Sequence, residues 1–531
     1  MFPTRLVSGL SLLSVALLNL GGLARARAES ASSVTQYGIT WTFDKAYPVG
    51  QFVTGDWWVV GPVTVVSVTP APGPAAADEP STSAKSIYGA PSLSDDKRYR
   101  NGSMIVLGPP KDGAWTKQGY DSRALNFDPA LSVKFPAPLL VNQSLISTMS
   151  SETYKNGKLD TPFIAGTVFP GKPRLTAELA LDTAAILTCL DKAPPADAFR
   201  PAYAGTDKTI YETKNIQWQL LPNLKAPATT PDWDKMNRVF ERPWLDHIGD
   251  WVIQYSAPGN NQPAYGGEVT HAYALASLML LLDGPKEQKE KLMISYLQKG
   301  IDLHGLAMAG RMWFSDGGHW MGRKWPILFA SEMLNAPELR TFPPVDATKP
   351  ILYDKITLEP GSAGPAPTTF FSEDLDTYYG KGAEGQTALW RVTYHTYSRQ
   401  PYLEKPFAEW TEDDKFQNNY IWIPACWPGE ALAALYMKQK ATWNHDAYFD
   451  FNDWFMAPGQ TRYDSKTGEK KPTRVGTDKF IQEMWDTYRA SAPEQPNGKD
   501  NLTWQWNGTP TPEGKMYSKK GHWVENAKPT P

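Results

Sequence analysis

The sequence predicts a mainly α-helical protein in which an (α/α) toroid follows a β-rich N-terminal domain. Runs of β-branched and aromatic residues between Val34 and about Ala165 favour strands. Apolar residues at helical spacing begin at Arg174, and short Gly and Pro breaks separate the helical segments that follow. Because antiparallel helix pairs joined by short loops are typical of toroids, we expect a β-rich domain over residues 29–170, a toroid over 171–492 and an irregular tail over 493–531.

The first 28 residues have the pattern of a secretory signal peptide. Arg5 precedes the apolar run from Leu6 to Leu23, and the A-R-A triplet at 26–28 offers small residues for cleavage before Glu29. The alternative, a membrane anchor, is weaker because Ser, Asn and Gly interrupt the run. No later segment of the sequence is apolar enough to span a bilayer, so the sequence predicts a secreted or periplasmic protein.

Strands are expected early in the β-rich domain, at residues 38–43, 56–60 and 63–68, where β-branched and aromatic residues lie between Gly and Pro. The tract from Pro70 to Ser83 is rich in Pro, Ala and Ser and is interpreted as a loop. The sequence of this domain has no His, Asp or Glu cluster at metal-ligand spacing, so we expect its role to be structural.

A series of helices is expected in the α-rich part. The segment from Glu268 to Leu282 is apolar on nearly all sides and should be buried. A proline at the first helical position fits a helix that begins at about Pro326. The expected helices cover residues 174–190, 233–255, 268–282, 286–304, 326 onwards, 384–390, 427–441, 446–456 and 480–490.

Composition and motifs argue against several classes of function. A net charge of -3 argues against a general nucleic-acid binder, which would be strongly basic. Cys189 and Cys426 allow either one disulfide or two buried thiols, and two cysteines are too few for a Cys-ligated zinc site. The sequence has no P-loop, dinucleotide fingerprint or nucleophile elbow, which leaves nucleotide-dependent and serine-hydrolase functions without support.

The stretch from Gly300 to Phe329 is where we expect a binding site. It carries Arg311, Arg323 and Lys324 between tryptophans, with glycines that let the backbone turn or approach closely. Cations interleaved with aromatic rings suit an anionic sugar chain, because the cations bind carboxylates and the rings offer flat faces to pyranoses. The alternative is a Gly-rich connection whose tryptophans belong to the core and whose charges are solvated.

Four short motifs resemble secreted polysaccharide lyases of the α/α-toroid type. The motifs are YGG at Tyr265, GIDLHG at Gly300, GGHWMGRKWPILFA at Gly317 and WNHDAYFDFNDWFM at Trp443. By this resemblance the nearest family is polysaccharide lyase family 38, whose members cleave alginate or glucuronan. The similarity extends from Arg174 to Met456. It implies β-elimination on a polyuronate without a metal or another cofactor.

Such a lyase removes the C5 proton of a uronic acid while a cation or hydrogen-bond donor holds its carboxylate. The segment from Trp390 to Arg399 offers groups for both tasks. If it is extended, Arg391, His395 and Tyr397 share one face, with Tyr397 as base and acid, Arg391 on the carboxylate and His395 assisting. If it is helical, Tyr394 replaces Tyr397. Alternatively, both tyrosines are core aromatics beside a surface arginine.

Further substrate contacts are expected from three places. Besides its three cations, the central stretch offers His319 as an additional catalytic or carboxylate-binding group and Trp320 for stacking. Tyr265 and His271 flank the entry to the buried helix, although a core role for His271 is an equal alternative. The third place is a polar and aromatic loop with Asn418, Asn419, Tyr420 and Trp422.

Two other histidines are interpreted as structural. His247 lies in an amphipathic segment and is expected to be a satisfied helix residue. His445 lies in the run from Asn444 to Asp446, which we interpret as a helix cap rather than a metal site, because no third ligand is evident in the sequence.

Two rival classes of function remain open. A glycoside hydrolase would need two carboxylates about 5–9.5 Å apart, and Asp316, Asp374 and Asp376 are its candidates. A non-catalytic binder of anionic polysaccharide would hold the polymer without shortening it.

Overall fold

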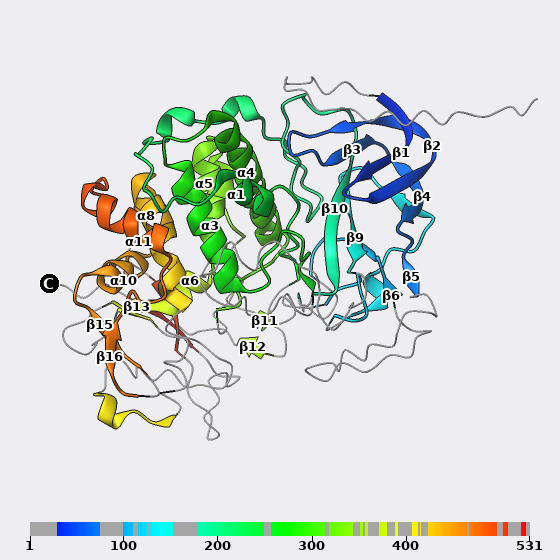
Figure 1. The fold of residues 1–531 in the computed structure, drawn as a ribbon. Coiled ribbons are helices and arrows are strands. Elements are labelled where there is room, and N and C mark those ends of the chain that lie inside the picture. Colours follow the sequence, from blue (N-terminus) through cyan, green and yellow to red (C-terminus); the bar gives the residue numbers. More distant parts are fainter. Residues whose placement is uncertain are drawn as a thin grey trace, which may run out of the picture.

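The computed structural model describes residues 29–74, 99–109, 115, 117–124, 127–151, 179–248, 256–313, 318–343, 351–353, 356–358, 371–379, 388–390, 406–412, 415, 423–464, 467–495, 503–507 and 522–526. A β-rich part and a helical part lie side by side (Figure 1). The predicted signal peptide and most of the predicted tail lie outside the described residues.

An eight-stranded sheet forms the β-rich part, with strand order β7-β9-β10-β3-β2-β4-β8 and with β1 paired to β2. Neighbouring strands are antiparallel except for β10 and β3, which are parallel. The predicted strands at 38–43, 56–60 and 63–68 are confirmed as parts of β2, β3 and β4. The sheet contains β1 Glu29–Gln36, β2 Ile39–Gln51, β3 Trp57–Val60, β4 Val63–Thr69, β7 Ser103–Ile105, β8 Ala137–Leu139, β9 Gln143–Ser150 and β10 Leu181–Leu190, and β5 Gly73–Pro74 pairs separately with β6 Tyr99–Arg100.

The prediction of a helix over residues 174–190 is wrong. Its second half is β10, which lies inside the sheet between β9 and β3. All residues of β10 except Asp182 are buried. A strand buried on both faces is apolar along its whole length, and its periodicity does not distinguish it from a buried helix. The sheet therefore includes residues beyond 170, where we expected the β-rich domain to end.

The helical part is built around α3, whose residues are all buried and which contacts α4, α8 and α11. The predicted buried helix at 268–282 is confirmed, as are the helices expected near 286, 326, 427, 446 and 480. The helix expected at 233–255 ends at Phe240. The helices of this part are α1 Trp233–Phe240, α3 Gly266–Leu280, α4 Lys286–Met308, α5 Lys324–Met333, α8 Trp427–Tyr436, α9 Lys440–Trp443, α10 Asp446–Met456 and α11 Lys479–Tyr488.

The prediction of an (α/α) toroid is wrong. A toroid needs an unbroken series of helix pairs, but between α5 and α8 the described residues form the five-residue helix α6 and two small strand pairs. The helix predicted at 384–390 has its last three residues in β14, because so short an apolar run shows no period. The short elements are α6 Ser372–Asp376, β11 Ile351–Tyr353, β12 Ile356–Leu358, β13 Thr377–Tyr379, β14 Ala388–Trp390, β15 Thr461–Tyr463, β16 Lys470–Pro472, β17 Thr503–Asn507 and β18 His522–Asn526.

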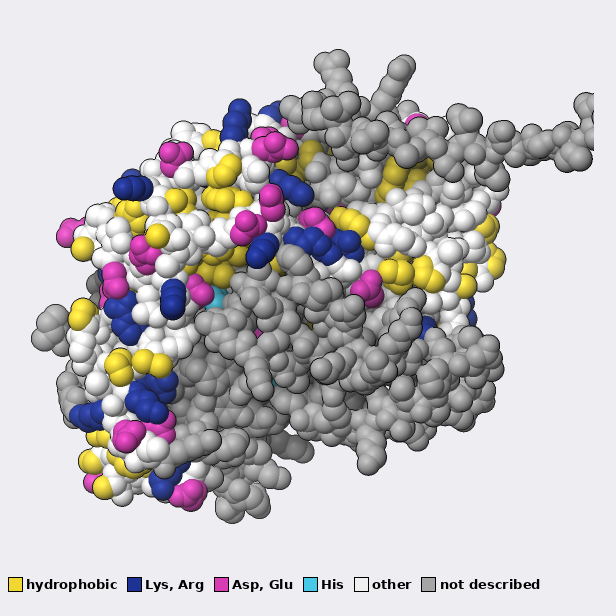
Figure 2. Space-filling model, in the orientation of Figure 1, with side chains coloured by type: hydrophobic (Ala, Val, Ile, Leu, Met, Phe, Trp, Pro, Cys, Tyr) yellow, Lys and Arg dark blue, Asp and Glu magenta, His cyan; other side chains and the backbone are white. Residues whose placement is uncertain are grey.

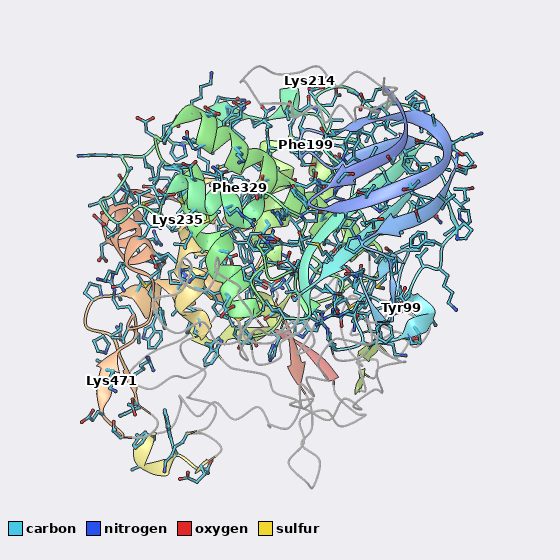
Figure 3. The ribbon with its side chains drawn as sticks, turned by 45° about the vertical axis from the view of Figure 1, so that its right-hand side comes forward. Tyr99, Phe199, Lys214, Lys235, Phe329 and Lys471 are labelled. Atoms are coloured by element: carbon cyan, nitrogen blue, oxygen red, sulfur yellow. The ribbon has the colours of Figure 1, made fainter. Side chains whose placement is uncertain are left out.

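One apolar core joins the two parts of the molecule. It contains Met104 and Ile186 of the sheet together with residues of α3, α4, α5 and α8. Phe199, on the segment between the sheet and the helices, and Phe329 of α5 are both fully buried in this core (Figure 3). This continuity places residues of the β-rich part next to the helical part.

The surface and the cysteines complete this description. Acidic and basic side chains are interspersed over the helical part of the face in Figure 2, in keeping with the small net charge. Cys189 and Cys426 are both buried and free, so the two-thiol alternative is confirmed. No helix within the described residues is both long and apolar enough to cross a bilayer.

Candidate active site

The central stretch enters α5 through a tight turn that packs against α3. Gly318 and Gly322 have φ angles of 84° and 85°, in the left-handed region that favours glycine. A Cβ atom at Gly322 would lie only 2.6 Å from the hydroxyl oxygen of Thr270 on α3. The glycines therefore permit the close approach that buries the residues of this turn.

Arg311 is fully buried against two indole rings. Its guanidinium carbon lies 4.0 Å from the ring centre of Trp320 and 5.7 Å from that of Trp115, which belongs to the β-rich part. Such cation–π contacts hold a guanidinium group in place. The contact of Trp320 with Arg311 differs from the sugar stacking expected from the sequence.

Tyr265 and His319, two residues predicted for the site, lie together at the start of α3. Their rings meet edge to face with centres 4.9 Å apart, and both side chains are buried. The contact arises because Tyr265 precedes α3 and His319 lies in the turn that packs on it.

A chain of hydrogen bonds between two phenols and an imidazole lies near Arg311. The hydroxyl oxygen of Tyr120 is 3.0 Å from Nε2 of His247, and the hydroxyl oxygen of Tyr203 is 3.4 Å from Nδ1 of the same ring. The backbone N–H of Asp246 donates to the Tyr203 hydroxyl at 3.1 Å. We call Tyr120, His247 and Tyr203 the phenol–imidazole chain. The two hydrogen bonds satisfy the His247 ring, as we expected, but His247 lies in a turn after α1 and not in a helix, and it bridges both parts of the protein.

Burial keeps the phenol–imidazole chain uncharged. It lowers the pKa of His247 to about 3, and the positive charge of Arg311 acts in the same direction. Burial also raises the pKa values of Tyr120 and Tyr203 well above 10. At neutral pH one nitrogen of the His247 ring accepts a hydrogen bond and both phenols keep their protons. The site thus combines a neutral base with two neutral proton donors.

Arg323 and Lys324 are bound to carboxylates of the protein itself. Nη2 of Arg323 lies 2.8 Å from Oδ1 of Asp246. Nζ of Lys324 lies 2.5 Å from Oδ2 of Asp374 and donates to the carbonyl oxygen of Trp443 at 2.6 Å. A substrate carboxylate would therefore have to compete with these bonds for Arg323 or Lys324.

Two more buried carboxyl groups, those of Glu373 and Glu430, interact electrostatically with Lys324 and Arg323, respectively. The backbone N–H of Gly322 donates to Oε1 of Glu373 at 2.6 Å. Burial raises the pKa of Glu373 to about 7. It raises the pKa of Glu430 well above 4.5, and the neighbouring Glu373 adds to this effect. We call Asp246, Glu373, Asp374 and Glu430 the acid cluster, and within it burial favours the protonated forms of Glu373 and Glu430.

The Glu373 carboxyl group should make stability fall with rising pH. Its pKa is 4.5 when exposed and about 7 when folded, so between these values the folded state binds more protons, and stability declines as pH rises. Replacing Glu373 with Gln should flatten the decline, which is on the order of 3 kcal/mol. Urea denaturation at steps between pH 5 and 8 measures this slope. The exposed Glu412 offers a control, and an unchanged slope in Glu373→Gln contradicts the prediction.

The remaining predicted residues that the structure describes lie elsewhere. His271 is on α3 with Nε2 3.7 Å from Oδ2 of Asp478, and burial lowers its pKa to about 4. His445 directly precedes α10, as the cap interpretation requires, but its Nε2 lies 2.6 Å from the hydroxyl oxygen of Thr377 and does not cap the helix. Asp376, a hydrolase candidate, accepts a hydrogen bond from Ser372 at 3.1 Å.

Several predicted residues lie outside the described residues, and their roles stay predictions. They are Arg391, Tyr394, His395 and Tyr397, the loop residues Asn418, Asn419, Tyr420 and Trp422, and the hydrolase candidate Asp316. Within the described part of the chain, no three His, Cys, Asp or Glu side chains are grouped so that they could hold a metal ion.

No protein-family model matches this chain, and neither the curated proteins nor the solved structures provide a match.

Proposed function

We propose that this protein is an exported polysaccharide lyase that cleaves an anionic polyuronate of the alginate or glucuronan type by β-elimination. The observation that carries the proposal is the phenol–imidazole chain beside the buried guanidinium group of Arg311. It supplies a base, an acid and a cation within one small region. The signal-peptide pattern of residues 1–28 supports export.

Each group has a defined task in the proposed reaction. Arg311 binds the uronate carboxylate and stabilises the negative charge that develops on it. His247 takes the C5 proton, the electrons of that C–H bond form the C4–C5 double bond, and the C4–O bond breaks. A phenol of the chain protonates the departing oxygen and regains a proton from the imidazolium ring. The net result is the transfer of one proton from carbon to the leaving oxygen.

Substrate binding should make His247 a better base. In the free protein, burial and the charge of Arg311 hold its pKa at about 3. A uronate carboxylate on Arg311 neutralises this charge and places a negative charge near the ring, and both changes raise the pKa of the imidazole. The base is therefore strengthened when its substrate is present.

One assay separates the proposal from its rivals. The protein is mixed with alginate, glucuronan, pectate and glycosaminoglycans while ultraviolet absorbance and reducing ends are followed. A lyase produces both signals, because its product carries a conjugated double bond. Reducing ends without absorbance would indicate a hydrolase, binding without shortening would indicate a binding protein, and either outcome overturns the proposal.

Glycoside hydrolysis is the second candidate, and the observation that favours it is Glu373. A buried carboxyl group with a pKa of about 7 has the property required of a general acid. The partner would be an ionised carboxylate, but Asp246 and Asp374 are both bound to cations. The hydrolase mechanism would thus have to break an ion pair, whereas the lyase mechanism has to break only one neutral hydrogen bond, between a phenol and the His247 nitrogen that takes the proton.

Tyr397 and Tyr120 are competing candidates for the proton-donating phenol, and phenylalanine variants distinguish them. If the phenol–imidazole chain performs the reaction, Tyr120→Phe should lower turnover about 10²-fold or more, and Tyr397→Phe should leave it nearly unchanged. The reverse result would assign the role to Tyr397, as the sequence motif suggests. Initial rates of ultraviolet absorbance measure both, with circular dichroism as the check on folding.

A further inference from the structure

A pocket of about 490 Å³ lies where the last turns of α4 meet residues 202–211. Its walls come from residues 202–211, from the last turns of α4, from the 3-10 helix Pro337–Arg340 and from Leu107 after β7. The volume falls within the range of about 300–1,000 Å³ that is usual for small-molecule sites.

The walls of this pocket are apolar and partly open to solvent. Ile301 and Leu339 are buried in the wall, whereas Met308 and Leu107 line the pocket with 46% and 49% of their surfaces exposed. Large apolar side chains are costly to expose. An apolar ligand body that covered Met308 and Leu107 would therefore be stabilised.

The rim of the pocket carries hydrogen-bond acceptors and negative charge. The backbone N–H and the hydroxyl of Thr209 both donate to Asp207, at 3.1 and 2.8 Å, and so fix the Asp207 carboxylate. Tyr211, also in the pocket wall, donates to Glu338, an interaction that raises the pKa of the phenol further after burial has raised it. These two carboxylates favour a cationic ligand.

A histidine in the pocket wall adds a third acceptor. Nε2–H of His304 donates to the Thr341 carbonyl oxygen at 3.0 Å, and burial lowers the pKa of the ring, so Nδ1 of the neutral ring is an acceptor. In the part of the chain that the structure describes, no lysine or arginine lines the pocket. The nearby ammonium group of Lys208 donates to carbonyl oxygens of Ala202 and Gly205, at 2.6 and 2.8 Å.

We propose that this pocket binds a small organic ammonium ion whose apolar body covers Met308 and Leu107 and whose charge lies between Asp207 and Glu338. The site is separate from the proposed polyuronate site, because none of the residues that line it belongs to the phenol–imidazole chain. Its negative rim would also repel a uronate carboxylate. Its ligand class is therefore opposite in charge to the proposed substrate.

Three probes of similar shape and different charge test this proposal. Phenylbutylamine, phenylbutanol and phenylbutyrate are titrated into the full-length protein by calorimetry at low and high salt. The amine should bind about tenfold more tightly than the alcohol, the carboxylate should bind most weakly, and salt should reduce the preference for the amine. Equal affinity for all three probes, or no binding of the amine, overturns the proposal.

Variants locate the binding. Met308→Trp should fill the pocket and weaken amine binding at least tenfold, whereas Leu140→Trp, at an exposed apolar residue that does not line the pocket, should leave it unchanged. The double variant Asp207→Asn with Glu338→Gln should reduce the affinity for the amine to that for the alcohol, whereas Glu412→Gln should have no effect. If Met308→Trp and Leu140→Trp bind the amine equally well, the pocket is not the site. None of these readouts depends on lyase activity.

Discussion

Replacing His247 with Gln should lower turnover of the preferred polyuronate by about 10²–10⁴-fold, the usual worth of general acid–base catalysis. The reason is that the amide of Gln can still hydrogen-bond the Tyr120 hydroxyl but cannot accept a proton from carbon. His247 is 3% exposed and bonded to two phenols, so alanine would leave both hydroxyls buried without their partner. Gln is therefore the more informative substitution, and ultraviolet absorbance measures its effect.

The matched control is His271→Gln, at another buried histidine with a lowered pKa. It should retain wild-type turnover, since His271 lies on α3 with its imidazole facing Asp478 of the segment before α11. The turnover of Arg311→Lys gives a third comparison, because lysine keeps the positive charge of Arg311 but cannot stack a planar group on the Trp320 ring. Near-wild-type turnover in His247→Gln would remove the imidazole from the mechanism.

The sequence predicts individual elements of this fold better than their assembly. The buried helix α3 and the early strands show clear patterns over their own lengths, and the structure contains them. The apolar run of β10 does not distinguish a strand from a helix, because a segment buried on both faces has no informative period. Local helix pairs predict a toroid, but local pairing does not determine how helices and a sheet close around one core.

The candidate site shows the same limit. The cations and aromatic rings of the central stretch were identified from composition, and Arg311, Trp320, His319 and Tyr265 do lie in buried aromatic contacts. Tyr120 and His247, however, are 127 positions apart in the sequence, and no motif joins them. The ion pairs of Arg323 and Lys324 are equally non-local. That Asp246 and Asp374 already neutralise these two cations becomes evident only when the three-dimensional structure brings the distant segments together.

Replacing Arg200 with Met should destabilise the folded protein by about 3–5 kcal/mol, the usual cost of leaving buried charges without their partner. Arg200 is fully buried, and its Nε lies 2.7 Å from Oδ2 of Asp56, which precedes β3. Its Nη1 and Nη2 donate to the two carboxylate oxygens of Asp302 on α4, at 2.9 and 2.6 Å. One guanidinium group thus joins the sheet to the helical part. Urea denaturation measures the loss.

The comparison is Arg489→Met, which removes an equally short pair with Asp453 on the surface. Exposed pairs contribute less than about 1 kcal/mol, so a similar loss in both variants would contradict the assignment of a desolvated network to Arg200.

The pH dependence of the stability of Arg200→Met gives a second test. Burial raises the pKa of Asp302 even though Arg200 opposes this. Without Arg200, the pKa of Asp302 in the folded state rises further above its value in the unfolded state. The protonated Asp302 carboxyl group then contributes stability at low pH, and this contribution is lost as pH increases. The destabilisation of Arg200→Met should therefore be larger at pH 8 than at pH 5, and Asp302→Asn in the same background should remove most of that difference.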